Sequence, residues 1–273
     1  MPLFALRTSG IYTRGMTQVR SHDFIQSLER GLAVMNSFSR ERTSQTLSEV
    51  AEQTGLTRAT ARRVLLTLAE LGYVHQNGRA FSLTPKVLDL GYSFLASFQV
   101  VELAQQSMER LVDEVKESSS MSVLDGPEIV YVARVPTKRI MTISLAIGSR
   151  LPAYPTSMGR VLLAGLPEPE MEDYMARTRF EQLTPHTITD ADRLRSTLAK
   201  VRSDGYALVD QELEEGVRSI AAPIRNGRGK VIAAMNVSCH ASRVTVTRMR
   251  EEFRPRLLAA ASEISERVGL LPG

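Results

Sequence analysis

Three arginines, Arg58, Arg62 and Arg63, are spaced so that they lie at the start and on the outer face of one short predicted helix. Their planar guanidinium groups can grip phosphate oxygens or pair in a bidentate way with the paired acceptors of guanine. Thr57 directly precedes them and is a good N-cap, and Ala59 is small enough to permit close approach. The pattern therefore indicates that this helix contacts nucleic acid.

Apolar residues on the opposite face of the same helix predict a packed core beneath it. They recur at helical spacing and are Ala61, Val64, Leu65, Leu68 and Leu71. The preceding helix opens with Thr46 and Glu49 in a capping box and ends at Gly55. Two short helices joined by a glycine turn are typical of a helix-turn-helix, whose second helix enters the major groove.

A predicted hairpin completes a winged motif. Asn77-Gly78 separates two short strand-like runs, and we expect both turn residues to have positive φ. Arg79 would sit at the tip, within reach of a minor groove or a phosphate. The alternative is a three-helix module that binds protein, with solvated arginines; the order of cap, turn, basic face and wing favours DNA. The predicted DNA contacts are Thr46, Thr57, Arg58, Ala59, Thr60, Arg62, Arg63 and Arg79.

The charge of the chain is concentrated around this motif. The 273 residues carry a formal net charge of +4, and residues 1–85 hold ten Lys/Arg against six Asp/Glu, while residues 86–273 hold 24 of each. The excess thus lies where phosphate contact is expected. Residues 1–22 contain three arginines and no acid, so we expect a flexible basic arm.

Cys239 is the single cysteine, which excludes an intramolecular disulfide framework. No run approaches a membrane span of ~20 apolar residues, and the N-terminus lacks a secretory core, so we expect a cytoplasmic protein.

Helices are also predicted on both sides of the motif. Residues 27–38 form a helix with Leu28, Leu32, Met35 and Phe38 facing inward. Residues 85–98 form a linker helix that starts at a proline and is apolar over much of its surface, which favours a dimer contact. From residue 99 a different pattern begins. We expect an antiparallel sheet flanked by helices, an α+β domain, with strands at 121–124, 129–135, about 140–145, 206–210, 219–224 and 231–238, and with helices at 99–117, 156–166, 168–178, 190–203 and 246–268.

Nothing in the sequence supports catalysis, and we expect no cofactor and no metal. The segment 226–230 contains two glycines and a lysine but lacks the spacing of a phosphate-binding loop, so it reads as a hairpin turn. Cys239 and His240 are neighbours on a predicted strand end, so their side chains diverge. A second domain with an undetected enzymatic activity is the non-regulatory alternative.

The order of parts resembles the IclR family of bacterial transcription regulators. The matching stretches cover nearly everything from about residue 24 onward, and they are Ser27–Phe38, Leu47–Leu71, Gly72–Val74, Leu83-Thr84, Tyr131–Arg134, Gly159–Ala164, Asp204–Tyr206 and Glu215–Ile224. Within the family, residues 118–125 and 139–160 look most like the branch that controls protocatechuate, 4-hydroxybenzoate and β-ketoadipate catabolism.

The resemblance implies four segments: the arm 1–22, a winged helix-turn-helix domain 23–84, a linker helix 85–98, and a GAF-like effector-binding domain 99–273. It also implies a homodimer or a dimer of dimers, a homotetramer, that binds operator DNA in response to a small carboxylic acid. The branch favours an aromatic acid or a ring-cleavage product as the effector. Regulation of another carboxylic-acid pathway remains the alternative.

The effector residues follow from the resemblance. It places the ligand near Ser157, Met158, Asp210, Ser219, Asn236 and Ser238, and Arg134 and Arg150 could supply a charged clamp. A helix N-terminus beginning near Ser157 offers free N–H groups to a carboxylate, and Met158 could form an adaptable apolar wall. The competing interpretation is that the serines are helix caps and Arg134 a structural ion-pair partner.

Overall fold

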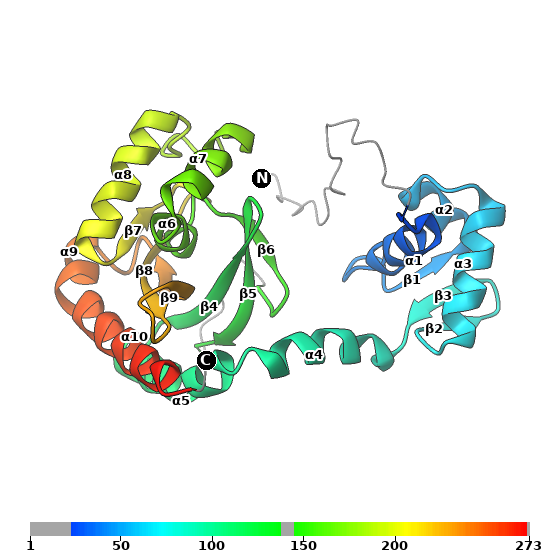
Figure 1. The fold of residues 1–273 in the computed structure, drawn as a ribbon, viewed down its shortest axis with the longest axis horizontal. Helices are drawn as coiled ribbons and strands as arrows, with labels where there is room; N and C mark the ends of the chain where they lie inside the picture. Colours follow the sequence, from blue (N-terminus) through cyan, green and yellow to red (C-terminus); the bar gives the residue numbers. More distant parts are fainter. Residues whose placement is uncertain (1–22, 138–144, 272–273) are drawn as a thin grey trace. The chain divides into compact units, whose positions relative to one another are not determined.

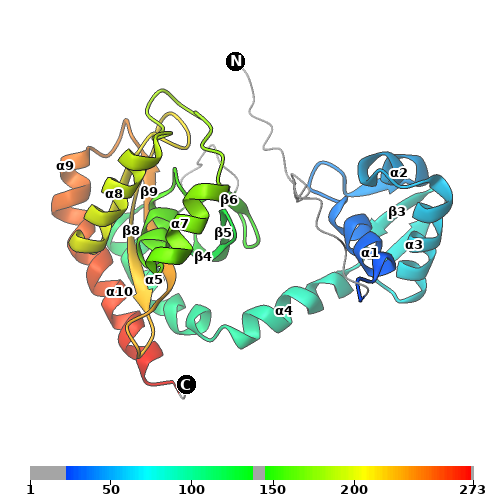
Figure 2. The same cartoon turned by 45° about the horizontal axis from the view of Figure 1, so that its top comes forward.

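The structure is a computed structural model that describes residues 23–137 and 145–271. The predicted basic arm, 1–22, lies outside the described residues. The chain divides into two compact units, with the division between Ala96 and Ser97 (Figures 1 and 2). Each unit has its own core, and each is described by itself.

The first unit is a small helical domain with a three-stranded antiparallel sheet of order β1-β3-β2. Its elements are α1 (Gln26–Asn36), β1 (Ser44–Thr46), α2 (Leu47–Thr54), α3 (Arg58–Glu70), β2 (Val74–Asn77) and β3 (Ala80–Leu83). Buried apolar side chains from the helices and the sheet form one core: Val34, Val50, Ala51, Ala61, Leu65, Leu68, Val74 and Phe81. The predicted helix-turn-helix and wing are both present.

The buried face of α1 differs from the prediction. Leu28 and Leu32 are exposed, by 60% and 49%, whereas Val34 is completely buried. Met35 and Phe38 are partly buried against the core, as predicted. The helix is thus rotated so that Val34 faces α3, which leaves Leu28 and Leu32 outward. Leu71 is also wrong as a core residue: it is the C-cap of α3 and is 53% exposed.

The wing turn lies one residue later than predicted and has a different geometry. Asn77 pairs with Ala80 across the hairpin, so the two-residue loop is Gly78-Arg79. Gly78 has φ of 58°, but neither Asn77 nor Arg79 has a positive φ. A positive φ at the first central residue alone is typical of a type II′ turn, in which glycine takes that position. The sequence also missed β1, which is three residues long and pairs with β3.

The linker is tied to the end of α3 by side-chain contacts. The Thr84 hydroxyl donates to the Gly72 carbonyl at 2.6 Å, and Lys86 Nζ donates to the Leu71 carbonyl at 2.9 Å. Lys86 Nζ also lies 5.0 Å from the centre of the Tyr73 ring. A short 3-10 turn, Pro85–Val87, then leads into α4 (Leu88–Ser97).

The second unit is built on a six-stranded antiparallel sheet of order β6-β5-β4-β9-β8-β7. Its strands are β4 (Ser118–Asp125), β5 (Glu128–Val135), β6 (Arg150–Pro152), β7 (Ala207–Asp210), β8 (Val217–Arg225) and β9 (Val231–His240). Its helices are α5 (Val100–Val115), α6 (Ser157–Ala164), α7 (Glu168–Arg177), α8 (Ala191–Asp204), α9 (Val246–Arg248) and α10 (Arg254–Gly269). Helices α5 and α10 pack on one face of the sheet, and α6, with α8 against it, covers the other (Figure 1). This is the predicted α+β class.

Two details of this unit differ from the predictions. Residues 140–144 of the predicted strand 140–145 lie outside the described residues, and the described edge strand is β6 at 150–152. The predicted single helix 246–268 contains a π-helical turn, Met249–Phe253, between α9 and α10. Among the described residues no single helix is long and apolar enough to cross a membrane; only the consecutive segments Pro85–Leu95 and Val100–Val115 reach that composition, and only when taken together.

Candidate functional site

The outer face of α3 carries the arginines that the sequence singled out. Arg58, Arg62 and Arg63 are all exposed on this helix, and Arg79 is exposed in the wing turn. In the described part of the chain none of these four guanidinium groups lies within ion-pair distance of a carboxylate. Unpaired cations on a helix and on a neighbouring wing suit contact with a polyanion.

The predicted threonines serve mainly to hold these helices in place. The Thr57 hydroxyl accepts from the Thr60 backbone N–H at 3.2 Å and donates to the Thr60 hydroxyl at 3.0 Å. Thr46 and Glu49 form the predicted capping box. Hydrogen bonds from the Thr46 backbone and hydroxyl lower the pKa of Glu49. The caps fix the start of α2 and α3, while Ala59 is exposed beside Arg58.

A cavity in the second unit lies between the sheet and the start of α6. Its empty volume is about 530 Å³, part of it open to solvent. Its lining residues come from every strand of the sheet except β4 and from the adjoining loops; they are Tyr131, Arg134, Leu145, Leu151, Pro155, Thr156, Ser157, Met158, Val209, Leu213, Val217, Ser219, Asn236 and Ser238. We call this the effector cavity. It brings together six of the eight residues named above for the effector site.

The polar groups of the effector cavity lie on neighbouring strands and at the start of α6. Ser219 Oγ donates to Ser157 Oγ at 2.8 Å, and Asn236 Nδ2 donates to Ser238 Oγ at 2.9 Å. Within the described residues no acceptor meets the hydroxyl protons of Ser157 and Ser238, so both can donate to a ligand. The first turn of α6 adds the positive end of the helix dipole.

Arg134 supplies the positive charge of the cavity. Its Nη1 donates to Ser120 Oγ at 3.1 Å, and no carboxylate in the described chain pairs with it. Burial lowers the pKa of Arg134. A half-buried, unpaired guanidinium favours an anionic ligand, because a carboxylate would compensate its charge.

The remaining walls are apolar. Met158 is 1% exposed, and its sulfur accepts from the Ser122 hydroxyl at 3.3 Å. Leu151, Val209 and Leu213 are among the other apolar lining residues. Burial raises the pKa of Tyr131 to about 12, so its phenol is neutral at physiological pH. One charged group within apolar and aromatic walls suits a small acid that carries an apolar or aromatic body.

Two predicted residues lie away from the effector cavity. Asp210 sits opposite Arg218 on β8, and its carboxylate accepts two hydrogen bonds from that guanidinium at 2.8 and 2.9 Å. Arg150 forms hydrogen bonds with Glu128 at 2.8 Å and with Asp125 at 2.5 Å. Neither residue lines the cavity. In both cases an ion pair within the protein already compensates the charge of the side chain.

The start of α6 is fixed from two sides. Thr156 caps it by accepting from the Gly159 N–H at 3.1 Å. Arg160 forms a buried bidentate pair with Glu212, at 2.7 and 2.5 Å, and Glu212 also accepts from the Ile188 N–H at 3.0 Å. This pair links α6 to the segment after β7, which carries Leu213 into the cavity. No local pattern predicts this pair, since the two residues are 52 positions apart in the sequence.

The lining residue Tyr131 was also missed as a site residue. Met121 pairs with Ala133 and Ser122 pairs with Tyr131, so Val132 is an extra residue in β5. Such a bulge reverses the alternation of faces along the strand. Simple alternation from Arg134 would place Tyr131 on the opposite face, so the strand pattern in the sequence does not predict it as a lining residue.

The family models match both units. The IclR helix-turn-helix domain matches residues 27–78, and the bacterial transcriptional regulator IclR C-terminal domain matches residues 92–266. The chain belongs to the IclR family. It is therefore a DNA-binding transcriptional regulator with an effector-binding domain, and proteins of the IclR family are regulators rather than enzymes.

Named relatives in the IclR family span almost the whole chain. The Pca regulon regulatory protein of Pseudomonas putida is 42% identical over 243 residues, which are 89% of this chain and 84% of the relative. The p-hydroxybenzoate hydroxylase transcriptional activator of Acinetobacter baylyi is 35% identical over 252 residues, 90% and 93% of the two chains. The predicted family and branch resemblance are thereby confirmed.

A solved structure with a bound aromatic acid is also similar. It is an IclR homologue from Microbacterium hydrocarbonoxydans in complex with 4-hydroxybenzoate. The TM-score is 0.79 at 26% identity, with 89% of this chain and 98% of that chain covered. The described residues of the present IclR family member contain no group of three or more His, Cys, Asp or Glu side chains arranged to hold a metal ion.

Proposed function

We propose that this regulator binds an aromatic acid, or a ring-cleavage product such as β-ketoadipate, in the effector cavity and that the ligand changes its affinity for operator DNA. The observation that carries the proposal is the convergence on one cavity of an unpaired Arg134 and the donor hydroxyls of Ser157 and Ser238. The ligands and targets named for the relatives support an aromatic acid over other carboxylic acids.

In the proposed complex the carboxylate of the ligand pairs with Arg134, and its ring lies against Met158, Leu151 and Leu213. The hydroxyls of Ser157, at the start of α6, and of Ser238, on β9, donate to the polar substituents. The charge of Arg134 gives the site its preference for acids, since the uncharged walls contribute mainly apolar contact. Asp210 is excluded from the contact set because Arg218 holds its carboxylate.

On the DNA side we propose that α3 enters the major groove and the wing contacts the adjacent backbone or minor groove. Arg62 and Arg63 then face base edges and phosphates, Arg58 lies at the start of the helix, and Arg79 reaches from the wing. Residues 23–84 would form the DNA-binding domain, 85–98 the linker and 99–273 the effector-binding domain.

We also propose a homodimer, or a dimer of dimers, acting in the cytoplasm. Large apolar side chains on α4 are strongly exposed: Leu88 by 73%, Leu90 by 52%, Tyr92 by 71% and Phe94 by 51%. This many exposed large apolar side chains on one helix favour self-association. A two-fold dimer would read two half-sites of a palindromic operator.

Calorimetric titration of the full-length protein with 4-hydroxybenzoate, protocatechuate and β-ketoadipate tests the effector class. We expect at least one of the three to bind. DNA duplexes that the protein selects from a random library can then serve as operator substitutes, and the same ligand should change the protein's affinity for them. Binding of none of them, together with binding of a non-aromatic acid, would assign the protein to another carboxylic-acid pathway. Chemical turnover of a bound acid would instead favour an enzyme.

A further inference from the structure

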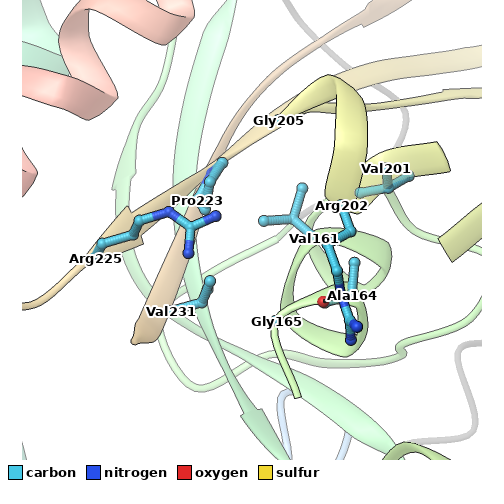
Figure 3. A pocket seen from close by; sticks show the side chains of 9 residues that line it. All are labelled: Val161, Ala164, Gly165, Val201, Arg202, Gly205, Pro223, Arg225 and Val231. Atoms are coloured by element: carbon cyan, nitrogen blue, oxygen red, sulfur yellow. Dashed lines mark hydrogen bonds between the residues drawn. The ribbon is translucent and has the colours of Figure 1, made fainter. Parts of the chain in front are cut away.

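A second cavity lies at the opposite end of α6. Its empty volume is about 450 Å³, and it shares no lining residue with the effector cavity. Figure 3 shows the lining residues, which are Val161, Ala164, Gly165, Val201, Arg202, Gly205, Pro223, Arg225 and Val231. The lining consists of small or apolar residues and two arginines, with no acidic residue.

This second cavity is formed on the same face of the sheet as the effector cavity. Along β8, Pro223 is four residues from Ser219 and so shares its face. Arg225 follows a register irregularity in the β8–β9 pairing, and it lines the cavity together with Val161 and Ala164 of α6. Ser157 and Met158 at the start of α6 line the effector cavity, and Val161 and Ala164 further along the helix line the second one. One short helix therefore contributes to both.

The two arginines are exposed and have no carboxylate partner in the described protein. No carboxylate among the described residues lies within ion-pair distance of Arg202 or Arg225. In the same unit Arg160, Arg195 and Arg218 each pair with a carboxylate, at 2.5, 2.7 and 2.8 Å. The second cavity thus shares with the effector cavity the feature of unpaired guanidinium groups beside apolar walls.

Backbone carbonyls hold both guanidinium groups in fixed orientations. Arg202 donates to the Ala164 carbonyl at 2.7 Å and to the Leu166 carbonyl at 2.9 Å, which also neutralises the negative end of α6. Arg225 Nη1 donates to the Gly229 carbonyl at 2.9 Å. Its guanidinium is turned toward the space between Pro223, Val231 and Val161 (Figure 3). The remaining N–H groups are therefore oriented before a ligand arrives.

We propose that this second cavity binds a small organic carboxylate with a compact apolar body. Arg225 is its main charge partner, Arg202 contributes a second cation, and the body contacts Val161, Val201 and Val231. The two cations disfavour a neutral ligand. The apolar floor disfavours a fully hydrated inorganic anion, which would lose water without replacement contacts.

Methyl NMR of the full-length protein with labelled valine side chains tests this site independently of the effector cavity. The probes are benzoate and inorganic phosphate. We expect millimolar benzoate to shift the methyl signals of Val201 and Val231, and Arg225→Gln to weaken this response about tenfold or more, as expected for loss of a charge-assisted contact. Arg134→Met, in the effector cavity, should leave the response unchanged.

Arg228→Gln is the matched control, because Arg228 lies in the turn that follows Arg225 but outside the lining. Thermal unfolding of both glutamine variants checks that they fold. The proposal is overturned if benzoate does not shift the methyl signals of Val201 and Val231. It is also overturned if Arg225→Gln and Arg228→Gln change this response to the same extent. Equal responses to phosphate and benzoate would overturn the organic class of ligand. If no aromatic acid binds in the effector cavity beside Arg134 while benzoate still shifts the valine signals, only the proposed function is contradicted.

Discussion

Tyr131 and Arg134 line the same cavity although they are three residues apart on one strand. In a regular strand this separation would place them on opposite faces. The extra residue Val132 restores them to one face, so the neutral phenol of Tyr131 and the guanidinium of Arg134 both meet the ligand space. The bulge thereby places the charge of the site beside an aromatic wall.

Replacing Arg134 should separate ligand binding from DNA binding. A hydrogen bond to a charged group contributes about 1.5–3 kcal/mol, so Arg134→Met should weaken binding of the active aromatic acid by roughly 10- to 100-fold. Operator affinity without ligand should not change, because Arg134 lies in the second unit. Calorimetry and an electrophoretic shift assay measure the two quantities.

Arg150→Met is the control for Arg134, since Arg150 pairs with Asp125 and Glu128 outside the cavity. Equal losses of ligand affinity in the two variants would show that general charge, rather than the cavity contact, governs binding.

Replacing the arginines of α3 should abolish specific DNA binding. Each bidentate base contact contributes about 1–3 kcal/mol, so Arg62→Ala/Arg63→Ala should weaken operator binding by several hundredfold or more. The single variants should show intermediate losses. Titration of labelled duplex at fixed salt concentration measures the affinities.

The charge-matched control for α3 is Arg193→Ala/Arg228→Ala, which removes two exposed arginines from the second unit. Unchanged operator binding by the Arg62/Arg63 double variant would contradict the assignment of α3 as the recognition helix.

A methyl group at Gly159 should destabilise the effector-binding domain. A Cβ built at this position would lie 2.0 Å from the Ala153 carbonyl oxygen, a backbone atom that cannot move away. Overpacking typically costs about 1–3 kcal/mol, and we expect Gly159→Ala to lower the free energy of unfolding by at least this amount. Urea denaturation followed by circular dichroism gives the value.

Gly31→Ala serves as the matched control, because nothing lies within 4 Å of a Cβ at this position of α1. Alanine is favoured over glycine inside a helix by roughly 0.5–1 kcal/mol, so this variant should be slightly stabilised. The two alanine substitutions should therefore change the free energy of unfolding in opposite directions. Changes of the same sign would contradict the steric argument.

The buried pair Arg160–Glu212 should be costly to break from one side only. Glu212→Ala leaves the Arg160 charge uncompensated in the core, which should lower the free energy of unfolding by about 3–5 kcal/mol. Arg160→Met/Glu212→Leu removes both charges and should recover most of that loss. Similar destabilisation by the single and double variants would show that packing, not charge, is responsible.

Cys239 should be unreactive in the folded protein. Burial, with a further contribution from Glu117, raises the pKa of its thiol to about 12, so almost no thiolate exists at pH 8. The group gains thiolate only as the pH approaches that value. A thiol reagent at pH 8 should label the native protein far more slowly than the urea-unfolded chain, and equal labelling rates would contradict this burial.

Local chemistry in the sequence was enough to predict the DNA-binding unit. The capping box at Thr46 and Glu49, the left-handed Gly55 and the N-cap Thr57 depend on neighbours within a few residues. The sequence contains all the information that such short-range signals need. The turn type at Gly78 could not be predicted in the same way, because it depends on the register in which β2 and β3 pair.

The effector cavity needed both the resemblance and the tertiary structure. The resemblance pointed to six residues that line it, yet it also pointed to Asp210, which Arg218 occupies instead. Only the folded sheet reveals the bulge at Val132 and the pair Arg160–Glu212, since both depend on contacts between segments far apart in the chain. The sequence by itself thus determined the helices, the helix caps and the charge of the DNA-binding unit. Tertiary structure decided which cations remain unpaired beside a cavity, because that depends on which carboxylates the fold brings within reach.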